Sequence, residues 1–163
     1  MFTAPPIDPD GRIATALRPL RGICVALASV VGLFIVLSWV LLEGMAIRPA
    51  RGIPRGASIA VTAFAMILLL LSSRMRSNIL RKAVPAIPGV PMSLDRLLAG
   101  YRQATLVSFA MLECSALAGM FVALLTGTAF YGIVLGAANL VSMATRWPRD
   151  TDVDRIARGR RSV

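Results

Sequence analysis

A single carboxylic acid, Glu113, lies near the middle of the apolar sequence ATLVSFAMLECSALAGMFVALLTG, which covers residues 104–127. An ionised carboxylate is costly in hydrocarbon, so such a group is either protonated or turned toward polar partners inside a helix bundle. The residues one helical turn away, at 109, 110, 116 and 117, are apolar and offer it no partner. A carboxyl group in this setting can carry a proton or bind a cation within a membrane.

One amide, Asn139, lies in the next apolar sequence, AFYGIVLGAANLVSMAT at 129–145. Two antiparallel helices turning at Gly127 would place Glu113, 14 residues before the turn, and Asn139, 12 residues after it, at nearly equal depth. We therefore expect the two side chains to meet. The pair has two interpretations: a site for proton or cation movement, or a neutral hydrogen bond that fastens the hairpin, worth about 1 kcal/mol or less.

Small residues recur at four-residue spacing in three apolar segments, which favours close approach of helix backbones. Asn139 would share one helix face with the glycine pair of its own segment. The expected helix-packing residues are Gly132 and Gly136, Ser115 and Gly119, and Ala28 and Gly32.

The composition is that of a membrane protein. Of 163 residues, 56% are hydrophobic and only 16% are charged. Four apolar segments, at 22–42, 57–73, 104–127 and 129–145, are each long enough to cross a bilayer as a helix. Because only helices can span singly in lipid, the sequence predicts an all-α protein with four transmembrane helices arranged as two antiparallel hairpins.

Basic residues give the expected orientation. With the N-terminus inside, fifteen Lys and Arg side chains lie on the cytoplasmic side and three, Arg48, Arg51 and Arg55, lie outside. This asymmetry predicts that both termini are cytoplasmic. Arg supplies seventeen of the eighteen basic residues, a bias common in GC-rich bacterial genomes. We expect the inner membrane of a bacterium.

The predicted organisation has five parts. A polar cytoplasmic lead at 1–21 precedes the first hairpin at 22–73, a basic and Pro-rich cytoplasmic loop at 74–92, the second hairpin at 93–145, and a basic cytoplasmic tail at 146–163. Ser93 is a good N-cap, and leucines at helical spacing follow it. The third helix is therefore expected to begin near Ser93, to run for about 33 residues and to project into the cytoplasm.

The start of the middle loop, RMRSNILRK at 74–82, has two interpretations. It is either an amphipathic turn or two lying on the inner leaflet or an extension of the second span. Its basic side chains are expected to contact anionic lipid headgroups. They are Arg74, Arg76, Arg81 and Lys82.

Catalytic and metal chemistry is not expected. The chain has no histidine, and its two cysteines lie inside apolar segments. Aspartates at 150, 152 and 154 have the spacing of a calcium loop, but Arg155 and Arg161 stand where that loop needs glycine and glutamate. The arginines are not interleaved with aromatic residues, so nucleic acid is not an expected partner. We expect no cofactor and no enzymatic activity.

The phrase MLECSALAGMFVALLTG resembles the carboxylate helix of the proteolipid (c-subunit) family of rotary ATPases, and YRQA at 101–104 resembles the polar loop that precedes it. That resemblance implies a proton site at Glu113. The third segment is also similar to that of uncharacterised small bacterial four-span proteins, through the pattern LE-x-x-AL-x-G, which implies no activity.

Two functions follow from these features. The first is a non-catalytic accessory or assembly protein that acts through helix packing and a basic cytoplasmic face. Its partners would be anionic headgroups and either a membrane protein or a second copy of the chain. The alternative is a proton- or cation-coupled membrane protein, proteolipid-like or a small transporter, that uses Glu113.

The charge asymmetry gives a testable topology. Reporter fusions at residues 50, 87, 128 and 163 are expected to be outside, inside, outside and inside, respectively. An external signal at residue 163 would contradict this orientation.

Overall fold

The computed structural model describes residues 11–44, 55–83 and 94–158, and every element in these ranges is helical. The helices follow the order α1 Arg12–Trp39, a π-helical turn η1 Val40–Gly44, α2 Arg55–Ala83, α3 Leu94–Thr126, α4 Ala129–Thr145 and α5 Asp150–Arg158. The all-α expectation holds for this part of the chain.

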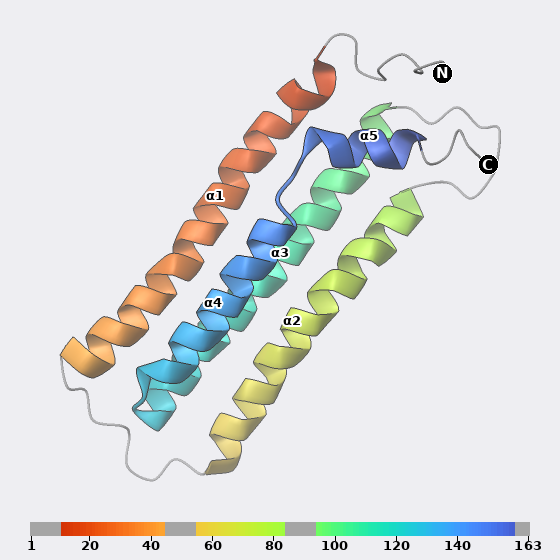
Figure 1. Cartoon of the computed structure of the whole chain (residues 1–163). Coiled ribbons are helices and arrows are strands. Elements are labelled where there is room, and N and C mark those ends of the chain that lie inside the picture. Colours follow the sequence, from red (N-terminus) through yellow and green to blue (C-terminus); the bar gives the residue numbers. More distant parts are fainter. Residues whose placement is uncertain (1–10, 45–54, 84–93, 159–163) are drawn as a thin grey trace, which may run out of the picture.

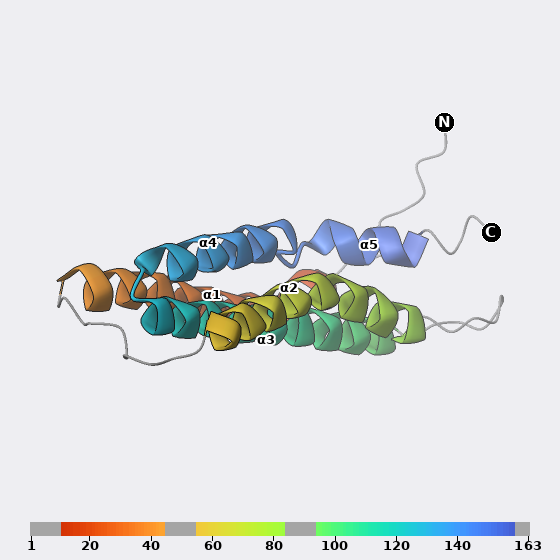
Figure 2. The ribbon, with the colours of Figure 1, turned by 90° about the horizontal axis from the view of Figure 1, so that it is seen from below.

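The four long helices form an elongated bundle around α3. Figure 1 shows α1 and α2 on opposite sides of the α3–α4 hairpin, and Figure 2 shows α4 lying above the layer formed by the other three. Helix α3 packs against α1, α2, α4 and α5, whereas α4 packs against α1 and α3. Helix α3 is thus the centre of the bundle.

Only the second expected hairpin is a packed pair. Helices α3 and α4 turn at Gly127, whose φ of 71° is a left-handed conformation that glycine adopts without strain, and they pack along their length. Helices α1 and α2 are antiparallel, but α3 and α4 separate them (Figure 1). The first hairpin was therefore predicted with the wrong packing, because sequence order fixed the directions of its helices but not their neighbours.

The N-terminal lead was predicted as polar up to residue 21, but α1 already begins at Arg12. Ile13, Leu17 and Leu20 are 0–2% exposed and belong to the core, which explains why this stretch is helical. Pro19 lies inside the helix, where it cannot donate a backbone hydrogen bond. Close to it, the Arg102 guanidinium of α3 donates to the carbonyl of Ala16.

The long third helix is confirmed. Helix α3 runs without a break for 33 residues, from Leu94 to Thr126. The residue expected to cap it, Ser93, lies outside the described residues. Leu97, Leu98 and Tyr101 are buried in one cluster with apolar residues of α1 and α5. The leucines at the start of α3 are thus covered by α1 and by the last described helix, α5.

The basic stretch 74–82 continues α2 as a helix to Ala83, which selects the second of the two interpretations. The Pro-rich part of the loop lies largely outside the described residues. Beyond α4, the last described helix, α5, packs against α1 and α3 at the end of the bundle where α1 begins (Figure 1).

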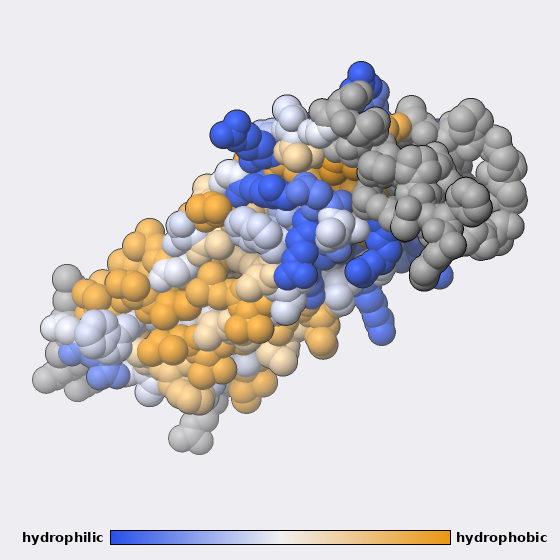
Figure 3. Space-filling model, turned by 45° about the horizontal axis from the view of Figure 1, so that its top comes forward, coloured by the Kyte–Doolittle hydropathy of each residue, from blue (hydrophilic) through white to orange (hydrophobic). Residues whose placement is uncertain are grey.

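In the described part of the chain, three helical segments are long and apolar enough to cross a membrane: Arg12–Gly44, Gly56–Lys82 and Leu94–Thr126. Helix α4 is apolar but shorter, with 17 residues, or about 26 Å. Figure 3 shows hydrophobic side chains over the half of the bundle farther from the described termini and hydrophilic ones at the nearer end. This segregation suits a protein that is partly surrounded by lipid.

The glycines of α4 lie where it meets α1. A methyl group at Gly132 would collide with Ser38, and one at Gly136 would collide with Ile35, both on α1. A methyl group at Gly119 would come within 2.8 Å of Leu135 on α4. Gly32 was expected to mark another close contact, but a methyl group there would meet nothing within 4 Å. Its neighbour in that pair, Ala28, is half-buried beside the core.

The contrast between two glycines gives a prediction. Gly132→Ala and Gly32→Ala gain the same helix propensity, but only the first places a methyl group against Ser38. We expect Gly132→Ala to be less stable than Gly32→Ala by about 1–3 kcal/mol, the usual cost of overpacking. Thermal unfolding of both variants in detergent measures the difference. Equal stability would mean that α4 does not approach α1 closely.

Candidate functional site

A hydrogen-bonded link joins three helices at mid-bundle. The Ser115 hydroxyl of α3 donates to the carbonyl of Ala65 on α2 at 2.8 Å. It also accepts from Nδ2 of Asn139 on α4 at 3.2 Å, and the same amide donates to the Leu135 carbonyl at 2.7 Å. Ser115 and Asn139 are 0% exposed. Since α2 and α4 flank α3, this hydroxyl holds both against it.

The expected pair between Glu113 and Asn139 is not formed. The Asn139 amide nitrogen is bound as described above, and its Oδ1 is buried without a hydrogen-bond partner among the described residues. The depth argument was sound, because Ser115 and Asn139 each lie 12 residues from Gly127. The direction was wrong: two residues turn a helix by about 200°, so Glu113 faces away from α4 when Ser115 faces it.

Glu113 instead lies at the edge of the buried face of α3 and is half-buried. It follows Arg102 by eleven residues, which is three turns to within about 20°, so both lie on one side of α3. Arg102 reaches α1 from that side. Over residues 11–44, 55–83 and 94–158, no hydrogen bond or ion pair to Glu113 is present.

The bundle interior beside Glu113 is closely filled. Phe109, Leu112 and Ala116, within one turn of it, are 0–1% exposed and belong to the main core. A proton or cation would therefore reach Glu113 along the side of the bundle rather than through its centre.

A cluster of arginines closes the end of the bundle that was expected to be cytoplasmic. Nη1 of Arg146, the residue after α4, donates to the Ser72 hydroxyl of α2 at 2.6 Å and to the Ser108 hydroxyl of α3 at 3.0 Å. Burial, and then the nearby positive charge of Arg76, lower the pKa of the Arg146 guanidinium from its ordinary value. Sequence analysis missed this contact, although an arginine directly after a span is a signal for it.

The four basic residues expected to contact lipid headgroups divide into two groups. Arg74, Arg81 and Lys82 are exposed. Arg76 is half-buried, and its guanidinium carbon lies 5.8 Å from the centre of the Tyr101 ring, a cation–π geometry. The helical continuation of α2 turns Arg76 toward α3, so it differs from the other three.

Helix α5 is held near this cluster by polar contacts. Arg21 of α1 forms an ion pair of 2.8 Å with Asp150 and donates to the Pro148 carbonyl. The Tyr101 hydroxyl donates to Asp152 at 3.4 Å. Asp150 thus contacts α1, and Asp152 contacts α3.

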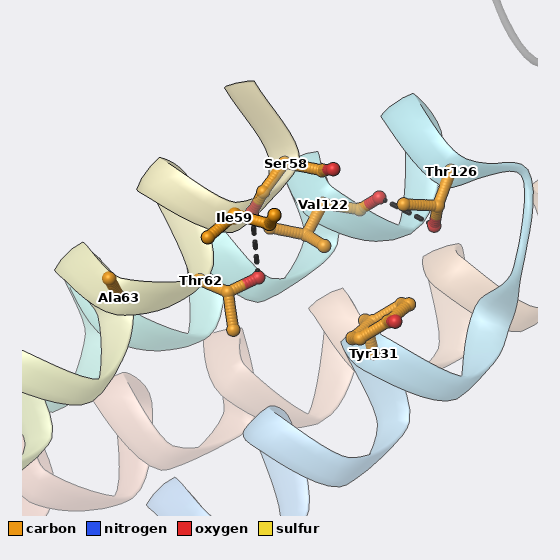
Figure 4. Close-up of a pocket in the computed structure, with 7 residues that line it drawn as sticks. All are labelled: Ser58, Ile59, Thr62, Ala63, Val122, Thr126 and Tyr131. Atoms are coloured by element: carbon orange, nitrogen blue, oxygen red, sulfur yellow. Dashed lines mark hydrogen bonds between the residues drawn. The ribbon is translucent and has the colours of Figure 1, made fainter. Parts of the chain in front are cut away.

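A shallow pocket of about 340 Å³ lies at the opposite end of the bundle, between α2, α3 and α4. Figure 4 shows Tyr131 of α4 facing hydroxyl-bearing residues of α2 and α3 across it. The lining is mainly apolar, and the Thr62 and Thr126 hydroxyls are bound to carbonyls of their own helices. The full lining is Ser58, Ile59, Thr62, Ala63, Val122, Thr126 and Tyr131.

No protein-family model, curated protein or solved structure matches the chain. The resemblance of the second hairpin to rotary-ATPase proteolipids therefore stays a prediction that rests on the residues quoted for it.

The contacts of Ser115 and the position of Glu113 predict which of the two polar residues fastens the bundle. Ser115→Ala removes the hydroxyl that joins α2 to α4 and should cost about 1 kcal/mol. Glu113→Leu removes no hydrogen bond of the described chain and should leave stability unchanged or higher. Melting temperatures in detergent compare the two. A larger loss for Glu113→Leu than for Ser115→Ala would show that the carboxyl fastens the bundle.

Proposed function

We propose that the chain is a small multi-pass inner-membrane protein of non-catalytic, accessory type, which joins a membrane assembly through the side of α3 that carries Glu113. Both termini and the arginine-rich end of the bundle would face the cytoplasm. The observation that carries the proposal is the half-buried position of Glu113, with no hydrogen-bond partner among the described residues.

The energetics of a carboxyl group in lipid support this proposal. A polar group at the middle of a span is unfavourable against hydrocarbon, by about 2.5 kcal/mol or more when it is charged. The bundle core turns its own polar groups inward, as at Ser115 and Asn139, but leaves Glu113 at an edge. A partner helix that presents a hydrogen-bond donor or a basic side chain at this depth would remove the cost. A group that is unfavourable in the isolated chain becomes favourable in a complex.

The second candidate function is proton or cation coupling through the same carboxyl group. Its support is that Glu113 lies on an outer side of the bundle, where a neighbouring subunit could exchange a proton with it. The filled core beside it disfavours a pathway through the chain itself. Coupling would therefore also need a partner.

The two functions make different predictions for Glu113→Gln and Glu113→Leu. If Glu113 binds a partner helix, native electrophoresis of membranes should show a complex that Glu113→Leu reduces by about tenfold and Glu113→Gln retains in part, because an amide still forms hydrogen bonds. Glu43→Gln is the matched control, since Glu43 is an exposed carboxylate in η1, directly after α1.

Three outcomes decide between the proposals. A complex lost only in the Glu113 variants supports the accessory function. Proton flux in proteoliposomes that Glu113→Gln abolishes supports the coupled function instead. A chain that is monomeric in its membrane, with no flux and no change in either variant, contradicts both.

A further inference from the structure

Two arginines lie together at one boundary of the apolar surface. Arg76 follows the apolar segment 57–73 of α2 by three residues, and Arg146 directly follows the apolar segment 129–145 of α4. Arg146 donates to Ser72, which precedes Arg76 by one helical turn, so its side chain reaches the turn of α2 that leads to Arg76. In a membrane, both guanidinium groups would lie at the depth of the headgroup phosphates.

The described chain does not neutralise these two charges. Neither arginine forms an ion pair within residues 11–44, 55–83 and 94–158. The described aspartates nearby are engaged elsewhere, Asp150 with Arg21 and Asp152 with the Tyr101 hydroxyl. Two like charges held close together repel each other, and this repulsion adds to the effect of burial in lowering the pKa of Arg146. An anion between them would turn this repulsion into attraction.

Both side chains are held in place but keep hydrogen-bond donors free. Arg146 uses Nη1 for the Ser72 and Ser108 hydroxyls, and no described residue accepts from its Nε or Nη2. Arg76 is fixed over the Tyr101 ring, and its Nε is buried without an acceptor. No described residue accepts from its Nη1 or Nη2, and these are the donors left for a ligand. Two oriented guanidinium forks are the arrangement that best binds the oxygens of a phosphate group.

The surface next to the cluster is apolar and exposed. Leu70 and Leu71 on α2 are 65% and 40% exposed, and Val141 on α4 is 64% exposed. Along the helix axes they lie five or six residues before the arginines, on the side away from α5, so they belong to the apolar part of the bundle that the arginines border. A free phosphate ion would leave these side chains uncovered, whereas the acyl chains of a lipid would lie against them. The ligand class that fits both surfaces is a phospholipid.

We propose that Arg146 and Arg76, steadied by Ser72, Ser108 and Tyr101, form a specific binding site for the phosphate of an anionic phospholipid in the inner leaflet. The leaflet rests on the orientation proposed above, but binding itself does not. The site differs from a general attraction of basic residues to the membrane, because it requires two particular arginines rather than net charge.

The test uses the purified full chain in detergent, where binding is independent of membrane orientation. Native mass spectrometry with phosphatidylglycerol, and with phosphatidylcholine of the same acyl chains, measures the lipid retained. We expect phosphatidylglycerol to be preferred. Arg146→Gln and Arg76→Gln should each weaken its binding by about tenfold, since each removes charge-assisted hydrogen bonds.

The chain offers matched controls for the loss of charge. Arg74→Gln lies on the same helix as Arg76, and Arg149→Gln lies just beyond Arg146, and both residues are exposed. These variants should change binding by less than about twofold. Arg146→Lys keeps the positive charge but lacks the planar set of guanidinium donors, so we expect an intermediate loss of phosphatidylglycerol binding. This variant replaces Arg146→Gln in the test if Arg146→Gln fails to fold.

Two results would overturn the proposal. Equal weakening in the Arg74→Gln and Arg149→Gln controls would show a diffuse electrostatic attraction. Displacement of phosphatidylglycerol by millimolar inorganic phosphate, with no preference over phosphatidylcholine, would show a site for a soluble anion instead of a lipid.

Discussion

The hydroxyl of Ser115 is the point on which the arrangement of the helices depends. It donates to the α2 backbone and accepts from Asn139 on α4, so one small side chain of α3 serves two neighbours. Helices in lipid gain little from the hydrophobic effect, because lipid is as apolar as their own surfaces. In a bilayer, close packing and buried hydrogen bonds would have to hold these helices together instead. Gly119 adds the close packing, since it lies one turn from Ser115 and contacts Leu135 of α4.

The same constraint leaves Glu113 outside the bundle's own hydrogen bonds. When Ser115 faces α2 and α4, helix geometry turns residue 113 away from both, to the edge of the buried face that borders α1. Helix α1 is apolar at that depth: Leu27 and Ala28 are partly buried against the core there, and the nearest hydroxyl, Ser29, is exposed and bound to its own helix. The packing that satisfies one polar residue of α3 therefore leaves another without a partner in the described chain. The proposed contact of the carboxyl group with another molecule rests on this packing.

Sequence patterns predicted the length and depth of the helices better than their rotation. The apolar segments and the long third helix follow from composition and from the leucine spacing after residue 93, and both agree with the structure. The predicted depth of Asn139 along the bundle was also correct, because its hydrogen-bond partner, Ser115, lies at the same level. Rotation depends on which neighbour each face meets. No local pattern in α3 tells whether residue 113 or residue 115 faces α4, although the two choices differ by half a turn.

The sequence also did not reveal which helices pack against each other. Consecutive antiparallel spans are expected to pack together, but α3 and α4 lie between α1 and α2. The glycine face of α4 explains part of this, because Gly132 and Gly136 accept Ser38 and Ile35 of α1. A pattern of small residues shows that some helix comes close without showing which one. Gly32 is the converse case, since it has the same spacing but meets no neighbour within 4 Å.

The arginines of the bundle end act on packing as well as on orientation. The topology prediction counts them as equal charges that all favour the same side of a membrane. In the structure they differ: Arg102 binds a carbonyl beside Pro19, Arg21 holds α5, and Arg146 ties α4 to α2 and α3. Arginine suits these contacts because its several donors can bind two acceptors at once, which a lysine ammonium does with less fixed geometry. The chain has a single lysine among eighteen basic residues. These contacts give a structural reason for arginine at three of the other positions.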